Sequence, residues 1–347
     1  MALLFYDGFD TYATADITKE WNSILGTVAI SPTDGRRSGS CLMAPSVTNT
    51  IHGTVTRTFA NRNSVVIGFA FKMSALPIDI SLSPIMRLLD GSSAQNEVTV
   101  SKTTGTLSVT RNGTVIAGPS AASISAGDYN YIEYKTFIHD TTGSFELRLN
   151  GETILSGSNI DTKATANASV SAISFGFSNA LAYQSKAVWS YDDIYILDAT
   201  GATNNDFLGD VRIDALYPTA DGNYTQWTPS TGVDHFALVD DPTPNTTDYV
   251  SDGTAGNKDS FVMADPPALA SQVIYGVRVK VAAAKDDAGA RSLKVGVRSG
   301  AVDSLSAAKA LSTSQLYYSN IHEVDPATGL AWSPSAVNAL EALIETA

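Results

Sequence analysis

Cysteine, histidine and basic residues are scarce in this sequence of 347 residues, and each scarcity excludes something. The one cysteine, Cys41, cannot form a disulfide within the chain. Cys41 stands in an apolar stretch, which predicts a buried structural thiol, because reactive thiols need an electropositive and partly exposed site. The four histidines are never spaced as metal ligands are, so the sequence gives little support to a zinc site or a histidine relay.

The charge is strongly one-sided. The chain has 22 basic and 35 acidic residues and a formal net charge of −13, which disfavours nucleic acid and anionic lipid as partners. No apolar stretch reaches the ~18 residues of a membrane span. The opening letters MALLFYDGFD lack the basic region of a signal peptide. We therefore expect a protein made in the cytoplasm, without a membrane span.

Alternation of apolar and polar residues dominates the chain up to residue 198 and predicts an all-β fold. Segments with this pattern are 51–59, 98–109, 129–139 and 145–149. Asn112-Gly113 and Asn150-Gly151 supply the positive φ angles of type I′ turns, so each predicts a tight hairpin. Many short strands joined by such turns favour a sandwich of two sheets over residues 1–198.

A second β-rich domain is predicted over residues 209–347, after a small and polar linker at 199–208. Alternation resumes in segments 210–216, 272–282 and 291–298, whereas the breaker-rich stretch 218–260 predicts long surface loops. The chain is expected to close with an amphipathic helix over 333–345. Its predicted N-cap is Ser333, its first residue is Pro334, and its apolar face holds Val337, Leu340, Leu343 and Ile344.

Four aspartates near the two ends of the first domain form the acidic cluster with the clearest structural logic. They are Asp7, Asp10, Asp192 and Asp193. If the first and last strands are neighbours, these hard oxygen donors could converge on a structural calcium ion. The alternative is that Asp7 makes a turn before Gly8 and that Asp193 is satisfied by backbone donors. No other cofactor is expected.

A glycan-cleaving site would need paired carboxylates, which sandwich hydrolases place at alternate positions on one strand. The predicted strands carry only isolated acids: Glu97, Glu133, Glu146 and Glu152. We therefore predict no catalytic residue. Two aromatics in a turn-rich loop, Tyr224 and Trp227, are the candidates for a surface that contacts a glycan or another subunit.

Three segments of the first domain suggest a family: LLFYDGFD at the start, TGSFELRLNGETIL in the middle and WSYDDIYILD at the end. They resemble the concanavalin-like or laminin-G-like jelly rolls of tailed-bacteriophage structural proteins. The segments NDFLGD, LYPTADGNYTQW and DPATGLAWSPSAVNALEALIE resemble the second half of the same proteins. The resemblance implies a concanavalin-like jelly roll followed by a second β-sandwich domain that ends in a helix.

The resemblance also implies a function. It favours a non-catalytic virion structural protein, in the tail, tail tip, fibre or head decoration, located in the virion. Its partners would be other virion proteins in a homo-oligomer or symmetric assembly, together with a host-surface glycan. A carbohydrate-binding module with host-surface affinity is the first alternative, and a glycan hydrolase is the second. Fold analogy alone does not choose among them.

Overall fold

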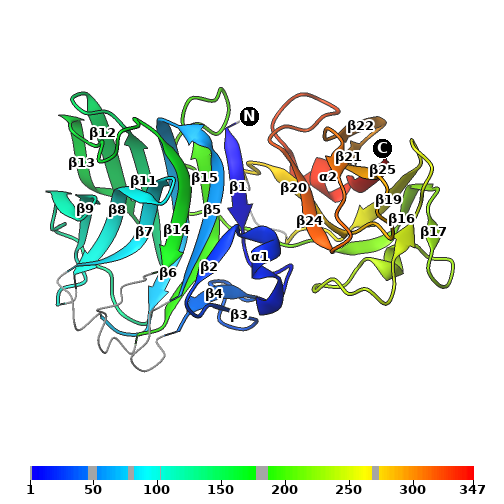
Figure 1. Ribbon diagram of the computed structural model, residues 1–347, viewed down its shortest axis with the longest axis horizontal. Helices are drawn as coiled ribbons and strands as arrows, with labels where there is room; N and C mark the ends of the chain where they lie inside the picture. The colour runs from blue at the N-terminus through cyan, green and yellow to red at the C-terminus, as the bar shows by residue number, and fades with distance from the viewer. Residues whose placement is uncertain (1, 46–52, 77–81, 102, 177–186, 268–272) are drawn as a thin grey trace. The chain divides into compact units, whose positions relative to one another are not determined.

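The computed structural model describes residues 2–45, 53–76, 82–101, 103–176, 187–267 and 273–347. The chain divides into two compact units, Met1–Ile213 and Asp214–Ala347, and each is described by itself. Both consist mainly of antiparallel strands (Figure 1), which confirms the predicted all-β fold. The predicted linker, 199–208, lies within the first unit, because the division falls after Ile213. Among the described residues, no helix has the length and hydropathy to cross a bilayer.

An eight-stranded sheet forms one layer of the first unit, with the order β13-β12-β11-β6-β15-β4-β3 and with β1 beside β15. We call it sheet A. Its strands are β13 (Glu152–Ile160), β12 (Gly143–Leu149), β11 (Asn130–Phe137), β6 (Ser64–Met73), β15 (Trp189–Asp198), β4 (Cys41–Ala44), β3 (Ala29–Ser31) and β1 (Leu3–Asp7). The first and last strands, β1 and β15, are neighbours, as the calcium hypothesis required.

A seven-stranded sheet, sheet B, forms the other layer, with the order β10-β9-β8-β7-β14-β5-β2. Its strands are β10 (Thr114–Ala117), β9 (Leu107–Arg111), β8 (Ser93–Ser101), β7 (Leu82–Asp90), β14 (Val170–Gly176), β5 (Thr54–Arg62) and β2 (Ser23–Leu25). The short helices η1 (Thr14–Asp16) and α1 (Ile17–Glu20) follow β1. Residues 51 and 52 of the predicted strand 51–59 lie outside the described residues.

Aromatic side chains fill the interior between the two sheets. The Phe69 ring of β6 lies 5.1 Å from that of Phe175 in β14, and Tyr191 of β15 packs against both rings. The predicted hairpin turns are present, because Asn112-Gly113 joins β9 to β10, Asn150-Gly151 joins β12 to β13, and all four residues have positive φ. The buried Cys41 also agrees with its prediction. The first unit is the expected jelly-roll-type sandwich.

The second unit is built on a six-stranded sheet with the order β16-β19-β25-β21-β22 and with β23 beside β21. Its strands are β16 (Pro218–Thr225), β19 (Lys258–Met263), β25 (Glu341–Thr346), β21 (Ser292–Ser299), β22 (Val302–Leu305) and β23 (Lys309–Ala310). Two smaller sheets pair β17 (Thr228–Pro229) with β18 (Val250–Ser251), and β20 (Val277–Ala283) with β24 (Leu316–His322). The short helices are η2 (Phe236–Leu238) and α2 (Pro334–Asn338). Residue 272 of the predicted strand 272–282 is not among the described residues.

Three predictions for the second domain are wrong, in whole or in part. The helix begins as expected, with Ser333 capping the Ala336 N–H and with Pro334 in the first turn, but it ends at Asn338. Residues 341–346 form the strand β25 between β19 and β21, because two neighbouring strands offer hydrogen bonds along both of its edges. The apolar spacing of 340–344 fits either a helix or a strand, and tertiary pairing decides between them. Residues 210–216, expected as a strand, form none, and the stretch 218–260 holds strand β16 as well as loops.

Candidate functional site

Strand β11 carries alternate side chains to opposite faces of sheet A. The hydroxyls of Tyr134 and Thr136 point inward, because both hydrogen-bond to Asn96 of β8 in the opposing sheet. The alternate residues therefore point to the outer face of sheet A. These residues are Tyr131, Glu133 and Lys135.

Glu133, Gly68 and Tyr195 lie in one row across three strands of this outer face. Gly68 of β6 pairs with Glu133 of β11 on one side and with Tyr195 of β15 on the other. A Cβ atom on Gly68 would lie 2.1 Å from Cε1 of Tyr195, so only glycine lets the ring lie over the strand. The Tyr195 hydroxyl reaches across and donates to Glu133 Oε1 at 2.5 Å.

An irregularity in β15 sets the direction of the next side chains. The pairing of β15 with β6 shifts register between Asp192 and Tyr195, and Asp193 has a φ of 47°. Such a left-handed conformation is costly for a residue other than glycine, and it persists only where the surroundings hold it. Here the Asp193 N–H donates to Asp192 Oδ1, and the Ile213 N–H donates to Asp193 Oδ1, both at 2.8 Å.

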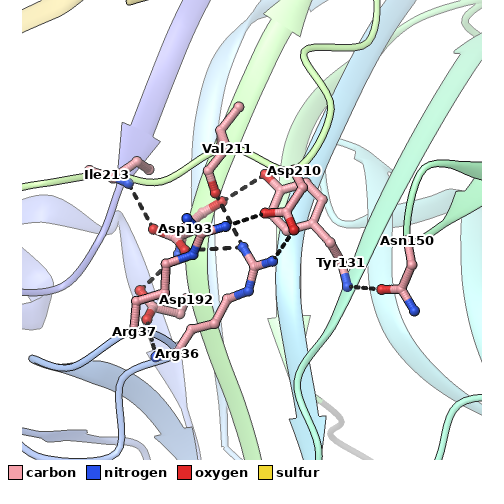
Figure 2. Close-up of polar contacts among 9 residues, drawn as sticks. All are labelled: Arg36, Arg37, Tyr131, Asn150, Asp192, Asp193, Asp210, Val211 and Ile213. Carbon is pink, nitrogen blue, oxygen red and sulfur yellow. Dashed lines mark hydrogen bonds and ion pairs between the residues drawn. The ribbon is translucent and has the colours of Figure 1, made fainter. Parts of the chain in front are cut away.

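The cation beside this aspartate pair is Arg36, from the loop between β3 and β4. Its backbone N–H donates to Asp192 Oδ2 at 2.8 Å, and its guanidinium lies 3.4 Å from Asp193 Oδ2. Figure 2 shows the guanidinium between Asp193 and Asp210, with which it forms a second ion pair. It also donates to the Val211 carbonyl at 3.2 Å and lies 4.9 Å from the centre of the Tyr131 ring.

Burial raises the pKa of both aspartates. The pKa of Asp192 rises to about 8, because desolvation and then the charge of Asp193 penalise its ionised form. The pKa of Asp193 is raised by burial and rises less than burial alone would give, because the Ile213 N–H and the Arg36 guanidinium stabilise its charge. A proton on Asp192 therefore relieves the repulsion between adjacent carboxylates near neutral pH.

Residues 206–213 run across this outer face, and we call them the strap. The Gly209 N–H donates to Glu133 Oε1 at 2.8 Å, and the Leu208 N–H donates to the Tyr195 hydroxyl at 3.2 Å. The Phe207 ring lies 3.9 Å from the guanidinium carbon of Arg148. The N–H groups of Leu208, Gly209 and Ile213 thus serve side chains of sheet A. Residues 210–216, predicted as a strand, form no strand here.

Glu133 has one oxygen satisfied and one not. The residue is 1% exposed, and Oε1 accepts from both Tyr195 and Gly209. Within the described part of the chain, Oε2 is buried and has no hydrogen-bond partner. An unsatisfied buried acceptor costs about 1–3 kcal/mol, so Oε2 is a place where a ligand hydroxyl would gain a strong bond.

The four aspartates of the calcium hypothesis do not form one group. Asp7 accepts from the Tyr12 hydroxyl at 2.6 Å and from the Trp21 indole at 3.0 Å, and Asp10 accepts from the Ser40 N–H. The aspartate pair of β15 lies with Arg36. The described ranges contain no group of three or more His, Cys, Asp or Glu side chains placed to hold a metal ion. Asp7 accepts from the Phe9 N–H two residues on, in a turn, and Asp193 accepts from the Ile213 N–H, as the alternative expects. Calcium binding at the four aspartates stays a prediction.

The two aromatics predicted for a contact surface are both half-buried. The Tyr224 hydroxyl donates to Asp303 at 3.0 Å, and its ring lies 5.2 Å from the Lys258 ammonium and 5.3 Å from the Arg298 guanidinium carbon. Trp227 packs against the core of the second unit, and its indole donates to a backbone carbonyl at 3.2 Å. A glycan contact at these two residues stays a prediction.

Sequence reasoning missed the site on sheet A because its members come from distant segments. In the sequence Glu133 is an isolated acid, although its strand carries Tyr131, Glu133 and Lys135 at alternate positions. That alternation is a signal for one polar face. The partners Gly68 and Tyr195 become visible only through the order β11-β6-β15, which no local pattern reveals.

No protein-family model matches the sequence, and no curated protein is significantly similar to it. Solved structures with a similar fold include a cellulose-induced protein, Cip1, at 14% identity and a TM-score of 0.44, covering 55% of this chain and 96% of that one. The alginate lyase vAL-1 from Chlorella virus is 11% identical with a TM-score of 0.42, and the match covers 56% of this chain and 99% of that one. A Trypanosoma rangeli sialidase is 11% identical with a TM-score of 0.35, and the match covers 49% of this chain and 27% of that one. At these values the likeness is one of fold.

These neighbours correct the function expected from the resemblance. Their titles name lyases, a sialidase and a cellulose-induced protein, and none of those given above is named as a virion component. These titles contradict the predicted non-catalytic bacteriophage virion protein and the prediction that the chain is not an enzyme. A likeness of fold at these values assigns no activity to this chain. Virion partners, symmetric assembly and virion location rested on the same resemblance.

Proposed function

We propose that the first unit binds a carbohydrate chain on the outer face of sheet A, around Glu133 and Tyr195. The observation that carries this proposal is the buried, unpartnered Oε2 of Glu133 beside an oriented tyrosine. A sugar hydroxyl directed at Oε2 would remove the cost of the unsatisfied acceptor.

The surrounding groups match the chemistry of a sugar ring. Sugars present hydroxyls that both donate and accept, and apolar C–H faces that pack on aromatic rings. The site offers a carboxylate acceptor in Glu133, guanidinium donors in Arg36 and Arg148, and the half-buried ring of Phe207. Pockets that bind small ligands combine apolar walls with a few oriented polar groups in this way.

The test is glycan-array binding followed by calorimetry with the full chain, its Glu133→Gln variant and a Glu97→Gln control. Glu97 is an equally buried carboxylate in sheet B, but both of its oxygens are bonded, to Arg87, Thr110 and the Gly113 N–H. Glu133→Gln keeps the shape and removes the charge. We expect it to weaken glycan binding about tenfold or more, since a hydrogen bond to a charged group contributes about 1.5–3 kcal/mol.

The control defines the outcomes. Glu97→Gln should lower stability and leave affinity unchanged. Absence of any bound glycan, or equal loss of affinity in both variants, would overturn the proposed site.

Cleavage of the bound glycan is a second candidate function, favoured by the 2.5 Å hydrogen bond between Tyr195 and Glu133. A buried hydroxyl paired with a carboxylate can take a proton from a bound sugar or return one to it. Tyr195→Phe keeps the ring and removes the hydroxyl. If the pair is catalytic, this variant should bind glycan and release no product. Product release unchanged in Tyr195→Phe would remove this candidate.

A further inference from the structure

We propose that the carbohydrate bound by sheet A is acidic, a chain of uronic acid units. We propose also that in the free protein the strap occupies the position where this carbohydrate binds. This inference rests on the carbohydrate-binding function proposed above. It starts from the side chains that the strap itself sets on the sheet.

Two aspartates of the strap form ion pairs with cations of the first unit. Asp206 lies 3.0 Å from the Lys135 ammonium, and Asp210 pairs with Arg36 and, at 2.9 Å, with Arg37. Between them, backbone donors of the strap bind Glu133 and Tyr195. The strap thus brings carboxylates to cations and hydrogen-bond donors to the central carboxylate, which is what an acidic sugar chain would also bring.

Cations gather here although the chain as a whole is acidic. The net charge of −13 on the protein repels an acidic ligand at long range, so such a ligand can bind only where positive side chains are clustered. The cations at the strap are Lys135, Arg148, Arg36 and Arg37. Glu146 also pairs with Arg148, and Asp193 with Arg36, so in the described part of the chain Lys135 and Arg37 are the cations that pair with the strap alone and would receive a ligand carboxylate.

The ion pairs of the strap are exposed enough to be exchanged. The Asp206 side chain is 65% exposed and Asp210 is 47% exposed, and exposed pairs contribute little to stability. The Asp206 carboxyl is ionised at neutral pH. Its slight burial opposes ionisation, but the Phe207 N–H and Lys135 outweigh it and lower the pKa. A carboxylate from solution can replace Asp206 on Lys135, or Asp210 on Arg37, at small cost. The pair of Asp210 with Arg36 is more buried, because Arg36 is 11% exposed.

Part of the cation set would stay fixed during such an exchange. The Arg36 side chain is 11% exposed, and Asp193 also holds its guanidinium. That bond does not involve the strap. Arg36 is thus oriented before ligand arrives, which limits the conformational entropy lost on binding.

The test is calorimetry on the full chain with an oligogalacturonate and with the same oligomer after reduction of its carboxyl groups to alcohols. We expect the acidic oligomer to bind about tenfold or more tightly, and added salt to weaken it selectively. The double variant Asp206→Asn/Asp210→Asn should bind the acidic oligomer about three- to tenfold more tightly, because Lys135 and Arg37 no longer pair with carboxylates of the strap.

The matched control is Asp161→Asn, which removes an exposed aspartate paired with Arg111 away from the strap. Its affinity should equal that of the parent chain. Thermal melts of each variant verify folding.

The outcomes separate the two proposals. Equal affinity for the acidic and reduced oligomers overturns the acidic preference and supports carbohydrate binding. Binding of neither oligomer, with no glycan bound on the array, overturns carbohydrate binding itself. Tighter binding of the acidic oligomer with no gain in the double variant overturns the role of the strap.

Discussion

At Gly68, one added methyl group should displace the Tyr195 ring from its position in the site. In Gly68→Ala, the new Cβ would lie 2.1 Å from Cε1 and 2.5 Å from Cζ of Tyr195. The ring is 1% exposed, so it has little room to move away. Displacing it breaks the 2.5 Å bond to Glu133 and the 3.2 Å bond from the Leu208 N–H.

Three contributions determine the change in the free energy of unfolding of Gly68→Ala. Overpacking a buried site costs about 1–3 kcal/mol. Loss of a hydrogen bond to a charged group costs about 1.5–3 kcal/mol. Replacing glycine in a strand returns about 0.5–1 kcal/mol, because the unfolded chain loses less freedom on folding. We therefore expect Gly68→Ala to lower the free energy of unfolding of the first unit by about 2–4 kcal/mol.

The assay is urea unfolding followed by tryptophan fluorescence, since Trp21 and Trp189 are both buried in the first unit. Gly253→Ala, in the second unit, is a control for adding a methyl group where there is room, because no atom lies within 4 Å of its added Cβ, and it should leave the unfolding of the first unit unchanged. That control should change the free energy of unfolding by less than about 0.5 kcal/mol. A Gly68→Ala protein as stable as the parent chain would refute the packing of Tyr195 on β6.

Three further predictions concern charge and packing. The folded state raises the pKa of Asp192 to about 8, so the folded protein holds a proton that the unfolded chain releases near pH 4. This group therefore lowers the free energy of unfolding as pH rises from about 4 to about 8. Urea unfolding of Asp192→Asn should show a smaller fall in the free energy of unfolding over that pH range, and the same fall as in the parent chain would contradict the raised pKa. Leu340→Asp places an unpaired charge in the core of the second unit, where Leu340 is 3% exposed. It should lower the free energy of unfolding of that unit alone by about 3–5 kcal/mol. An unfolding transition of the second unit that does not shift would show that Leu340 is not packed in its core. A chelator should leave the melting temperature unchanged, because Arg36 and backbone donors already satisfy the aspartate pair of β15, and a fall on chelation would restore the calcium hypothesis.

Local patterns in the sequence were sufficient where the chemistry is local. Positive φ at Asn150 and Gly151 follows from the residue types, and the hairpin between β12 and β13 follows from that turn. Period-two alternation in β11 and β12 likewise predicts both strands and which face of each is apolar. Two sheets packed through aromatic side chains are then the natural arrangement of so many short strands.

Local patterns failed where two long-range outcomes compete. The apolar stretch after Ser333 starts a helix by its cap, and only pairing with β19 and β21 turns residues 341–346 into a strand. Ile344 and Thr346, both β-branched, favour this outcome, but a six-residue segment is too short to decide it. The period of a short apolar segment is ambiguous until its neighbours are known.

The strap shows the same limit in a form that bears on function. The strap follows a stretch, residues 199–206, that is small and polar and carries no periodicity. This composition is equally that of a linker and that of a segment whose backbone bonds to side chains elsewhere. What distinguishes the two is the row Glu133, Gly68 and Tyr195, assembled from three strands. A buried carboxylate needs donors, and the N–H groups of Leu208 and Gly209 supply donors to this row. The segment is therefore ordered by the site that it covers.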